Sequence, residues 1–160
     1  MQNYLYEFLG TALLVLLGDA VVANVILNKT KGQNSGWIVI TLGWACAVLI
    51  PALIFTASGA VFNPALVLGL AAVGKLDWAV VPGYIIAEML GGFVGAVLVW
   101  VMYKNHFDDT EDGDTKLGVF CTGPAIRSYG NNFISEVIAT FVLVFAILGI
   151  AQTPVCLLYT

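Results

Sequence analysis

The stretch Ser58-Gly-Ala-Val-Phe-Asn-Pro-Ala-Leu66 interrupts one of the most apolar regions of this 160-residue chain with a glycine, an asparagine and a proline. Asparagine is favoured immediately before a helix, and proline is favoured in the first turn, where its missing N–H costs no hydrogen bond. Asn63-Pro64 therefore predicts the start of a helix. The small residues Ser58, Gly59 and Ala60 allow the backbone just before that start to stay extended.

The composition around this stretch is that of a membrane protein. Apolar residues make up 60% of the chain and charged residues only 10%, which is outside the usual range of soluble domains. Most of the net charge of −4 comes from one acidic run, residues 108–114, which predicts a solvated loop and gives no indication of a nucleic-acid partner. The three cysteines, Cys46, Cys121 and Cys156, lack metal-ligand spacing, so we expect packing residues, no metal site and no cofactor.

Hydropathy predicts an all-α membrane fold, because a bilayer core needs about 20 apolar residues for each helix that crosses it. The apolar region 37–73 is too long for one crossing and too short for two crossings with a turn. We therefore expect one span in this region, then the break, then a re-entrant half-helix over residues 63–73. Full spans are predicted over residues 4–27, 37–56, 78–103 and 133–151.

The chain contains the beginning of an internal repeat. Glu7-Phe-Leu-Gly-Thr11 and Glu136-Val-Ile-Ala-Thr140 each start a span with a glutamate, a threonine four residues on, and a run of apolar residues. Three spans separate the two starts, which predicts an inverted second copy. A second interrupted stretch would fall beyond Thr160. We therefore expect one repeat of three spans plus the first helix of another, as a single partial channel domain over residues 1–160.

Four carboxylates fall inside the predicted spans: Glu7, Asp19, Glu88 and Glu136. Glu7 and Glu136 hold equivalent repeat positions, which predicts that they brace non-helical backbone by accepting its hydrogen bonds. A proton relay is the alternative, which the absence of a basic residue from every span disfavours. The small residues of Gly91-Gly-Phe-Val-Gly95 predict the close approach of two helices.

The residues before the half-helix predict a polar path. Irregular backbone at membrane depth is tolerated only where it is buried or lines a wet cavity. The half-helix N-terminus adds about half a positive charge, and the Asn63 amide adds N–H donors. Together these groups favour neutral hydroxylic molecules over cations; an ordinary helix–loop–helix kink is the alternative. The acceptors of the path would be the carbonyls of Gly59, Ala60, Val61 and Phe62.

These motifs resemble the major intrinsic proteins, the aquaporin and glycerol-facilitator family, over almost the whole chain. The first helix of that family resembles residues 6–11, its second helix Gly43-Trp44, its first pore loop residues 58–65, and its fourth helix residues 134–136. Phe120-Cys-Thr-Gly-Pro124 is similar to a connection in the glycerol-conducting branch.

The resemblance implies a passive channel rather than an enzyme, one that conducts glycerol, water and small polyols across the cell membrane as a homotetramer. Asn63-Pro64-Ala65 would supply the central donor of the pore, and Trp44 a constriction aromatic. Helix packing is the alternative for Trp44, because its spacing to Asn63 is one residue short. Two positions depart from the family pattern: Val61 stands where histidine is frequent, and Glu88 where glutamine is.

The resemblance also implies parts that this sequence does not show: a second Asn-Pro-Ala, a constriction arginine and two further spans. We therefore expect a truncated product. Two alternatives stay open, namely a non-conducting fragment of such a channel and a secondary active transporter, which the absence of an intramembrane lysine or arginine disfavours. Two predictions of membrane orientation conflict. The linkers 28–36 and 104–132 carry five of the six basic residues, and that count alone would place both linkers in the cytoplasm. The resemblance to the family implies that both linkers lie outside, and we adopt this second orientation.

Overall fold

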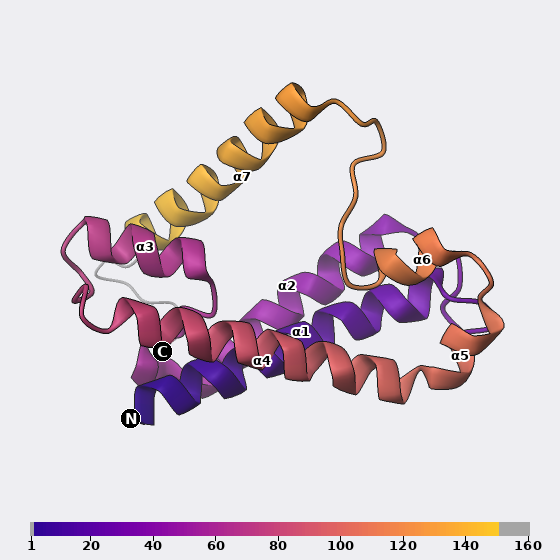
Figure 1. Ribbon diagram of the computed structural model, residues 1–160, viewed down its shortest axis with the longest axis horizontal. Helices are drawn as coiled ribbons and strands as arrows, with labels where there is room; N and C mark the ends of the chain where they lie inside the picture. Colours follow the sequence, from indigo (N-terminus) through magenta and orange to yellow (C-terminus); the bar gives the residue numbers. More distant parts are fainter. Residues whose placement is uncertain (1, 151–160) are drawn as a thin grey trace. The chain divides into compact units, whose positions relative to one another are not determined.

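The computed structural model describes residues 2–150, which fall into two compact units divided between Gly123 and Pro124. Helices form both units, and the described residues contain no strand, so the all-α prediction is confirmed. In the first unit (Figure 1) the elements are α1 (Gln2–Ile26), α2 (Trp37–Ile54), the 3₁₀ turn η1 (Thr56–Ser58), α3 (Pro64–Ala72), α4 (Val81–Met102), α5 (Lys104–Asp109) and α6 (Gly113–Gly118). The second unit contains α7 (Tyr129–Ile150).

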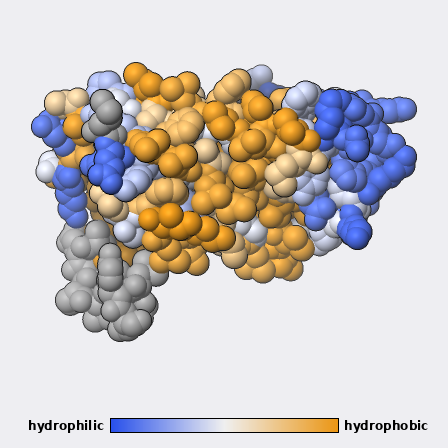
Figure 2. All heavy atoms as spheres, turned by 90° about the horizontal axis from the view of Figure 1, so that it is seen from below, coloured by the Kyte–Doolittle hydropathy of each residue, from blue (hydrophilic) through white to orange (hydrophobic). Residues whose placement is uncertain are grey.

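Four of the helices within residues 2–150 are long and apolar enough to cross a membrane, namely α1, α2, α4 and α7. Figure 2 shows a broad band of apolar side chains between hydrophilic ends, with a large hydrophilic patch at the α5 end of the first unit. This distribution fits a protein whose middle lies in hydrocarbon. The predicted fourth span ended at Ala151, which lies outside the described residues.

Two of the spans, α4 and α7, begin three and four residues away from their predicted starts. α4 begins at Val81 rather than Trp78, because the Asp77 carboxylate accepts a hydrogen bond from the Ala79 N–H at 2.9 Å and Pro82 occupies the first helical turn. The chain therefore turns before it becomes helical.

α7 begins at Tyr129 rather than Phe133. The Asn132 N–H donates to the Ser128 carbonyl at 2.8 Å, so helical hydrogen bonding starts ahead of the apolar run. A hydropathy pattern marks where the apolar run begins and not where the helix begins. The polar residues in the first turn of α7 therefore fall outside the predicted span.

The linker after α4 contains structure that its polarity does not predict. Phe107 of α5 and Val119, which follows α6, are buried against the C-terminal ends of α1 and α4. The rings of Phe107 and Phe120 stack with their centroids 5.6 Å apart. The Asn28 N–H, just after α1, donates to the Thr110 hydroxyl at 2.9 Å. Packed residues and hydrogen bonds therefore cover this end of the first unit, while most of the acidic run 108–114 is exposed, as the sequence predicts.

Helices α1 and α4 run side by side in the same direction (Figure 1), and two glycines bring their backbones together. A Cβ added at Gly91 would lie 2.3 Å from the Phe8 carbonyl oxygen, and one at Gly95 would lie 2.5 Å from the Ala12 carbonyl oxygen. Neither position has room for a side chain. The predicted close approach of two helices is therefore confirmed, and the partner of α4 is α1.

Gly91→Ala is expected to destabilise the protein, because its methyl group would push α4 away from the α1 backbone. Overpacking of this kind costs about 1–3 kcal/mol. Gly92→Ala is the matched control, since a Cβ there would meet nothing closer than 3.8 Å, and alanine favours the helix by about 1 kcal/mol. The unfolding temperature in detergent can be measured by heating samples and recording the remaining folded protein by size-exclusion chromatography. It should fall for Gly91→Ala only. Equal midpoints would contradict the assigned helix contact.

Candidate functional site

The backbone between α2 and α3 is folded into a compact irregular segment. η1 ends at Gly59, whose N–H donates to the Thr56 carbonyl at 3.1 Å and whose φ is 95°. Ala60 and Phe62 also have positive φ, at 51° and 48°. The expectation of an extended stretch is therefore wrong. Residues other than glycine adopt this conformation at a cost of about 1–3 kcal/mol each, and they keep it only where the surroundings hold them there.

The carboxylate of Glu7 holds part of this segment in place. Glu7 is fully buried on α1, with 0% exposure. Its Oε2 accepts a hydrogen bond from the Phe62 N–H at 2.8 Å, and its Oε1 accepts one from the Val61 N–H at 3.3 Å. The Tyr84 hydroxyl donates to the Ser58 carbonyl at 3.1 Å on the same segment. The strained backbone is thus fixed by side chains from α1 and α4.

Glu88 supplies a second carboxylate that the sequence did not assign to this task. Its Oε1, on α4, accepts a hydrogen bond from the Asn63 N–H at 3.0 Å. Three consecutive backbone N–H groups, those of residues 61–63, are therefore held by two buried carboxylates. The signal for Glu88 was indirect: an N–H before a helix cap at membrane depth needs an acceptor, and an intramembrane carboxylate can supply one.

Asn63 caps α3 as the sequence predicts for an Asn-Pro start. Its Oδ1 accepts hydrogen bonds from the Ala65 N–H at 2.8 Å and the Leu66 N–H at 3.4 Å, and Pro64 follows in the first turn. Capping leaves the amide N–H₂ of Asn63 without a hydrogen bond to any residue in the range 2–150. Within that same range, the carbonyls of residues 59–62 accept no hydrogen bond either. Donors and acceptors thus remain available around the cap.

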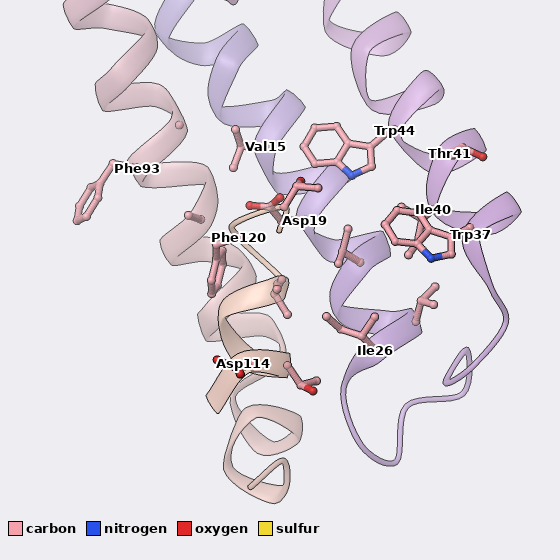
Figure 3. Close-up of a pocket in the computed structure, with 18 of the residues that line it drawn as sticks. Val15, Asp19, Ile26, Trp37, Ile40, Thr41, Trp44, Phe93, Asp114 and Phe120 are labelled. Carbon is pink, nitrogen blue, oxygen red and sulfur yellow. The ribbon is translucent and has the colours of Figure 1, made fainter. Parts of the chain in front are cut away.

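A cavity of about 1540 Å³ lies beside this segment, between α1, α2, α4 and the residues after α6 (Figure 3). Of the predicted pore residues, Trp44 and Pro64 line it, whereas residues 59–63 and Ala65 do not. Val61 and Phe62 are buried instead, and the Phe62 ring packs against Gly10 of α1. The structure therefore places Pro64, at the start of the half-helix, on the cavity wall, whereas Val61 and Phe62 before it are buried in the protein.

Trp44 lies both at the cavity and in a helix contact. Figure 3 shows its ring extending from α2 toward α1. A Cβ added at Gly18 of α1 would lie 2.5 Å from the Trp44 ring, so this glycine provides the space for the indole. The geometry thus gives Trp44 a role in α1–α2 packing while it remains on the cavity wall. Glu136, the predicted second brace, lies on α7 in the second unit.

The cavity also has polar side chains that the sequence analysis did not place there. Thr11 and Asp19 from α1 line it, and Asp112 and Asp114 line its end near α6. Hydrogen bonds from the hydroxyl and backbone N–H of Thr115 lower the pKa of the Asp112 carboxylate below its usual value. The period of α1 explains the first pair, since residues 11, 15 and 19 share one helix face.

Three relatives are similar to this sequence over nearly its whole length. The probable glycerol uptake facilitator protein of Thermotoga maritima is 56% identical over 94% of this chain and 64% of its own. Glycerol uptake facilitator protein 3 of Lactiplantibacillus plantarum is 52% identical over 91% of this chain and 61% of its own. The glycerol uptake facilitator protein of Streptococcus pneumoniae is 47% identical over 94% of this chain and 65% of its own.

This chain thus spans somewhat less than two thirds of the length of these curated relatives. The family model described as "Major intrinsic protein" matches residues 1–158. It covers the capped half-helix, the carboxylates that hold its approach, and the membrane-spanning helices around them. On this match the chain belongs to the major intrinsic protein family and is a multi-pass membrane protein.

Proposed function

We propose that this chain is part of a passive channel that facilitates the diffusion of glycerol across the cell membrane. The observation that carries the proposal is that, in the backbone before α3, the N–H groups are hydrogen-bonded and the carbonyls are not. Its N–H groups at residues 61–63 are held by Glu7 and Glu88, whereas its carbonyls at residues 59–62 and the Asn63 amide make no hydrogen bond among residues 2–150. A neutral molecule rich in hydroxyls can use both kinds of group.

The electrostatics of the segment favour a neutral solute. The N-terminus of α3 carries about half a positive charge from the helix dipole, and Pro64 places it at the cavity wall. No lysine or arginine lies within any of the four candidate spans of residues 2–150. Cations are therefore disfavoured near α3, and a fixed cationic partner for an anion is lacking there. Passive conduction needs no charged coupling group.

The names of the relatives support glycerol as the solute, since three similar proteins are glycerol uptake facilitators. Water and small polyols fit the same donors and acceptors, so we extend the proposal to them. We further propose that Trp44 lines the path, that Glu136 braces a second segment as Glu7 braces the first, and that the channel is a homotetramer. The competing functions are a non-conducting fragment and a secondary active transporter.

Glycerol flux into liposomes that contain the purified 160-residue chain tests the proposal directly. Stopped-flow light scattering in a glycerol gradient should show faster swelling than empty liposomes, without any dependence on a proton or sodium gradient. Swelling equal to that of empty liposomes would favour the non-conducting fragment. Dependence on an ion gradient would favour the transporter.

Asn63→Asp is expected to reduce glycerol flux about three- to tenfold, the effect of losing one hydrogen bond. Aspartate can still cap α3, but it lacks the amide donor and brings a negative charge to the path. Asn105→Asp, on the exposed α5, is the matched control and should leave flux unchanged. Equal flux through Asn63→Asp and the unmodified chain would exclude the Asn63 amide as a solute donor.

Glu7→Gln is expected to lower both stability and flux. The glutamine amide can accept only one of the two backbone hydrogen bonds, so one buried N–H would lose its acceptor at a cost of about 1–3 kcal/mol. The segment that presents the free carbonyls would then loosen. Glu111→Gln makes the same change at an exposed position and should alter neither property. Heating midpoints and glycerol flux measured together test this, and an unchanged midpoint for Glu7→Gln would contradict the brace.

A further inference from the structure

Two buried polar atoms on the cavity wall have no hydrogen-bond partner among residues 2–150. They are Oε2 of Glu88 and Oγ1 of Thr11. Glu88 is 1% exposed and Thr11 is 7% exposed, and both residues line the cavity. A buried polar atom without a partner is costly, and the cost is greatest at membrane depth, so each atom calls for a partner from outside these residues.

Thr11 on α1 and Glu88 on α4 both line the cavity close to the contact between these two helices. A Cβ added at Gly92 would lie 3.9 Å from Cγ2 of Thr11, and Gly92 lies one helical turn after Glu88 on the same face of α4. Glu7, one turn before Thr11, binds the backbone next to the residue that Glu88 binds. Thr11 and Glu88 are thus within about one helical turn of each other, close to the start of α3.

Glu7 and Glu88 differ in how many of their oxygens are used. Both oxygens of Glu7 accept backbone hydrogen bonds. In Glu88 only Oε1 does, from the Asn63 N–H at 3.0 Å. Oε2 is therefore not used by the backbone that Glu88 braces, and it has no partner among residues 2–150.

A hydroxyl group that reaches both atoms would satisfy them at once, because its O–H would donate to Oε2 of Glu88 and its oxygen would accept from the Thr11 hydroxyl. The positive end of the α3 dipole at Pro64 opposes a cation on this wall, whereas the Glu88 carboxylate attracts one, which makes a cation the competing occupant. We propose that Glu88 and Thr11 form a hydroxyl-binding subsite on the cavity wall, occupied by a hydroxyl of a small neutral polyol or by water. Only the polyol occupant rests on the proposed function.

Infrared difference spectroscopy of the reconstituted chain tests this subsite without relying on transport. Glycerol is added to one sample and sucrose of equal osmolality to the other, and hydrated films are compared with dried ones. We expect glycerol to shift a carboxyl band that is absent from Glu88→Gln. In Thr11→Val, the glycerol concentration that gives half of the shift should rise about three- to tenfold, as expected for one lost hydrogen bond.

Thr41→Val is the matched control. Thr41 lies on the same cavity wall, but its hydroxyl already donates to the Ile38 carbonyl at 3.0 Å, so the band shift should remain. Thr11→Val leaves the Glu88–Asn63 hydrogen bond intact, which keeps the test decisive if Glu88→Gln does not fold. A shift with hydration but not with glycerol supports the subsite and assigns it to water.

Three results would overturn the subsite: no band shift with either glycerol or hydration, an equal response in Thr11→Val and the unmodified chain, or the same shift produced by ammonium chloride. Failure of the proposed function is a separate result. A band shift without any glycerol flux would leave the subsite and remove the channel, whereas flux without a band shift would do the reverse.

Discussion

The structure depends on three consecutive backbone N–H groups that cannot reach a helical acceptor. Residues 61–63 lie at the break in an apolar chain, where unpaired N–H groups are expensive. Glu7 of α1 and Glu88 of α4 accept all three hydrogen bonds. Two carboxylates on two helices can reach one short segment only if the helices touch. Gly91 and Gly95 provide that contact, so the glycines and the carboxylates serve one constraint.

This constraint also determines which groups remain free. The carboxylates bind the segment through its N–H groups, so the carbonyls of residues 59–62 have no competing partner within the described chain. Asn63 repeats the same division within one side chain, since its oxygen caps α3 while its amide N–H₂ is unused. In the proposed function, stability and solute binding would therefore use opposite sides of the same peptide groups. A change to a brace should consequently affect transport as well as folding.

The sequence predicted the parts of the fold that follow from local rules. Span length came from hydropathy, the start of α3 from Asn63-Pro64, and the position of Glu7 in a repeat pointed to a brace. The positive φ of Ala60 and Phe62 and the use of Glu88 could not be predicted in this way. These features depend on contacts between α1, α4 and the break. A conformation that side chains from distant helices impose leaves no periodic signal in the residues that adopt it.

The position of Glu88 shows why such a contact matters for function. A carboxylate that only braced backbone would be best satisfied with both oxygens bonded, as in Glu7. Glu88 lines the cavity and has one oxygen on Asn63, while its other oxygen has no partner among residues 2–150. The same residue therefore links the cap of the half-helix to the space that a solute would enter. Occupation of that space would bear directly on the carboxylate that holds Asn63, which couples the solute to the backbone that presents its path.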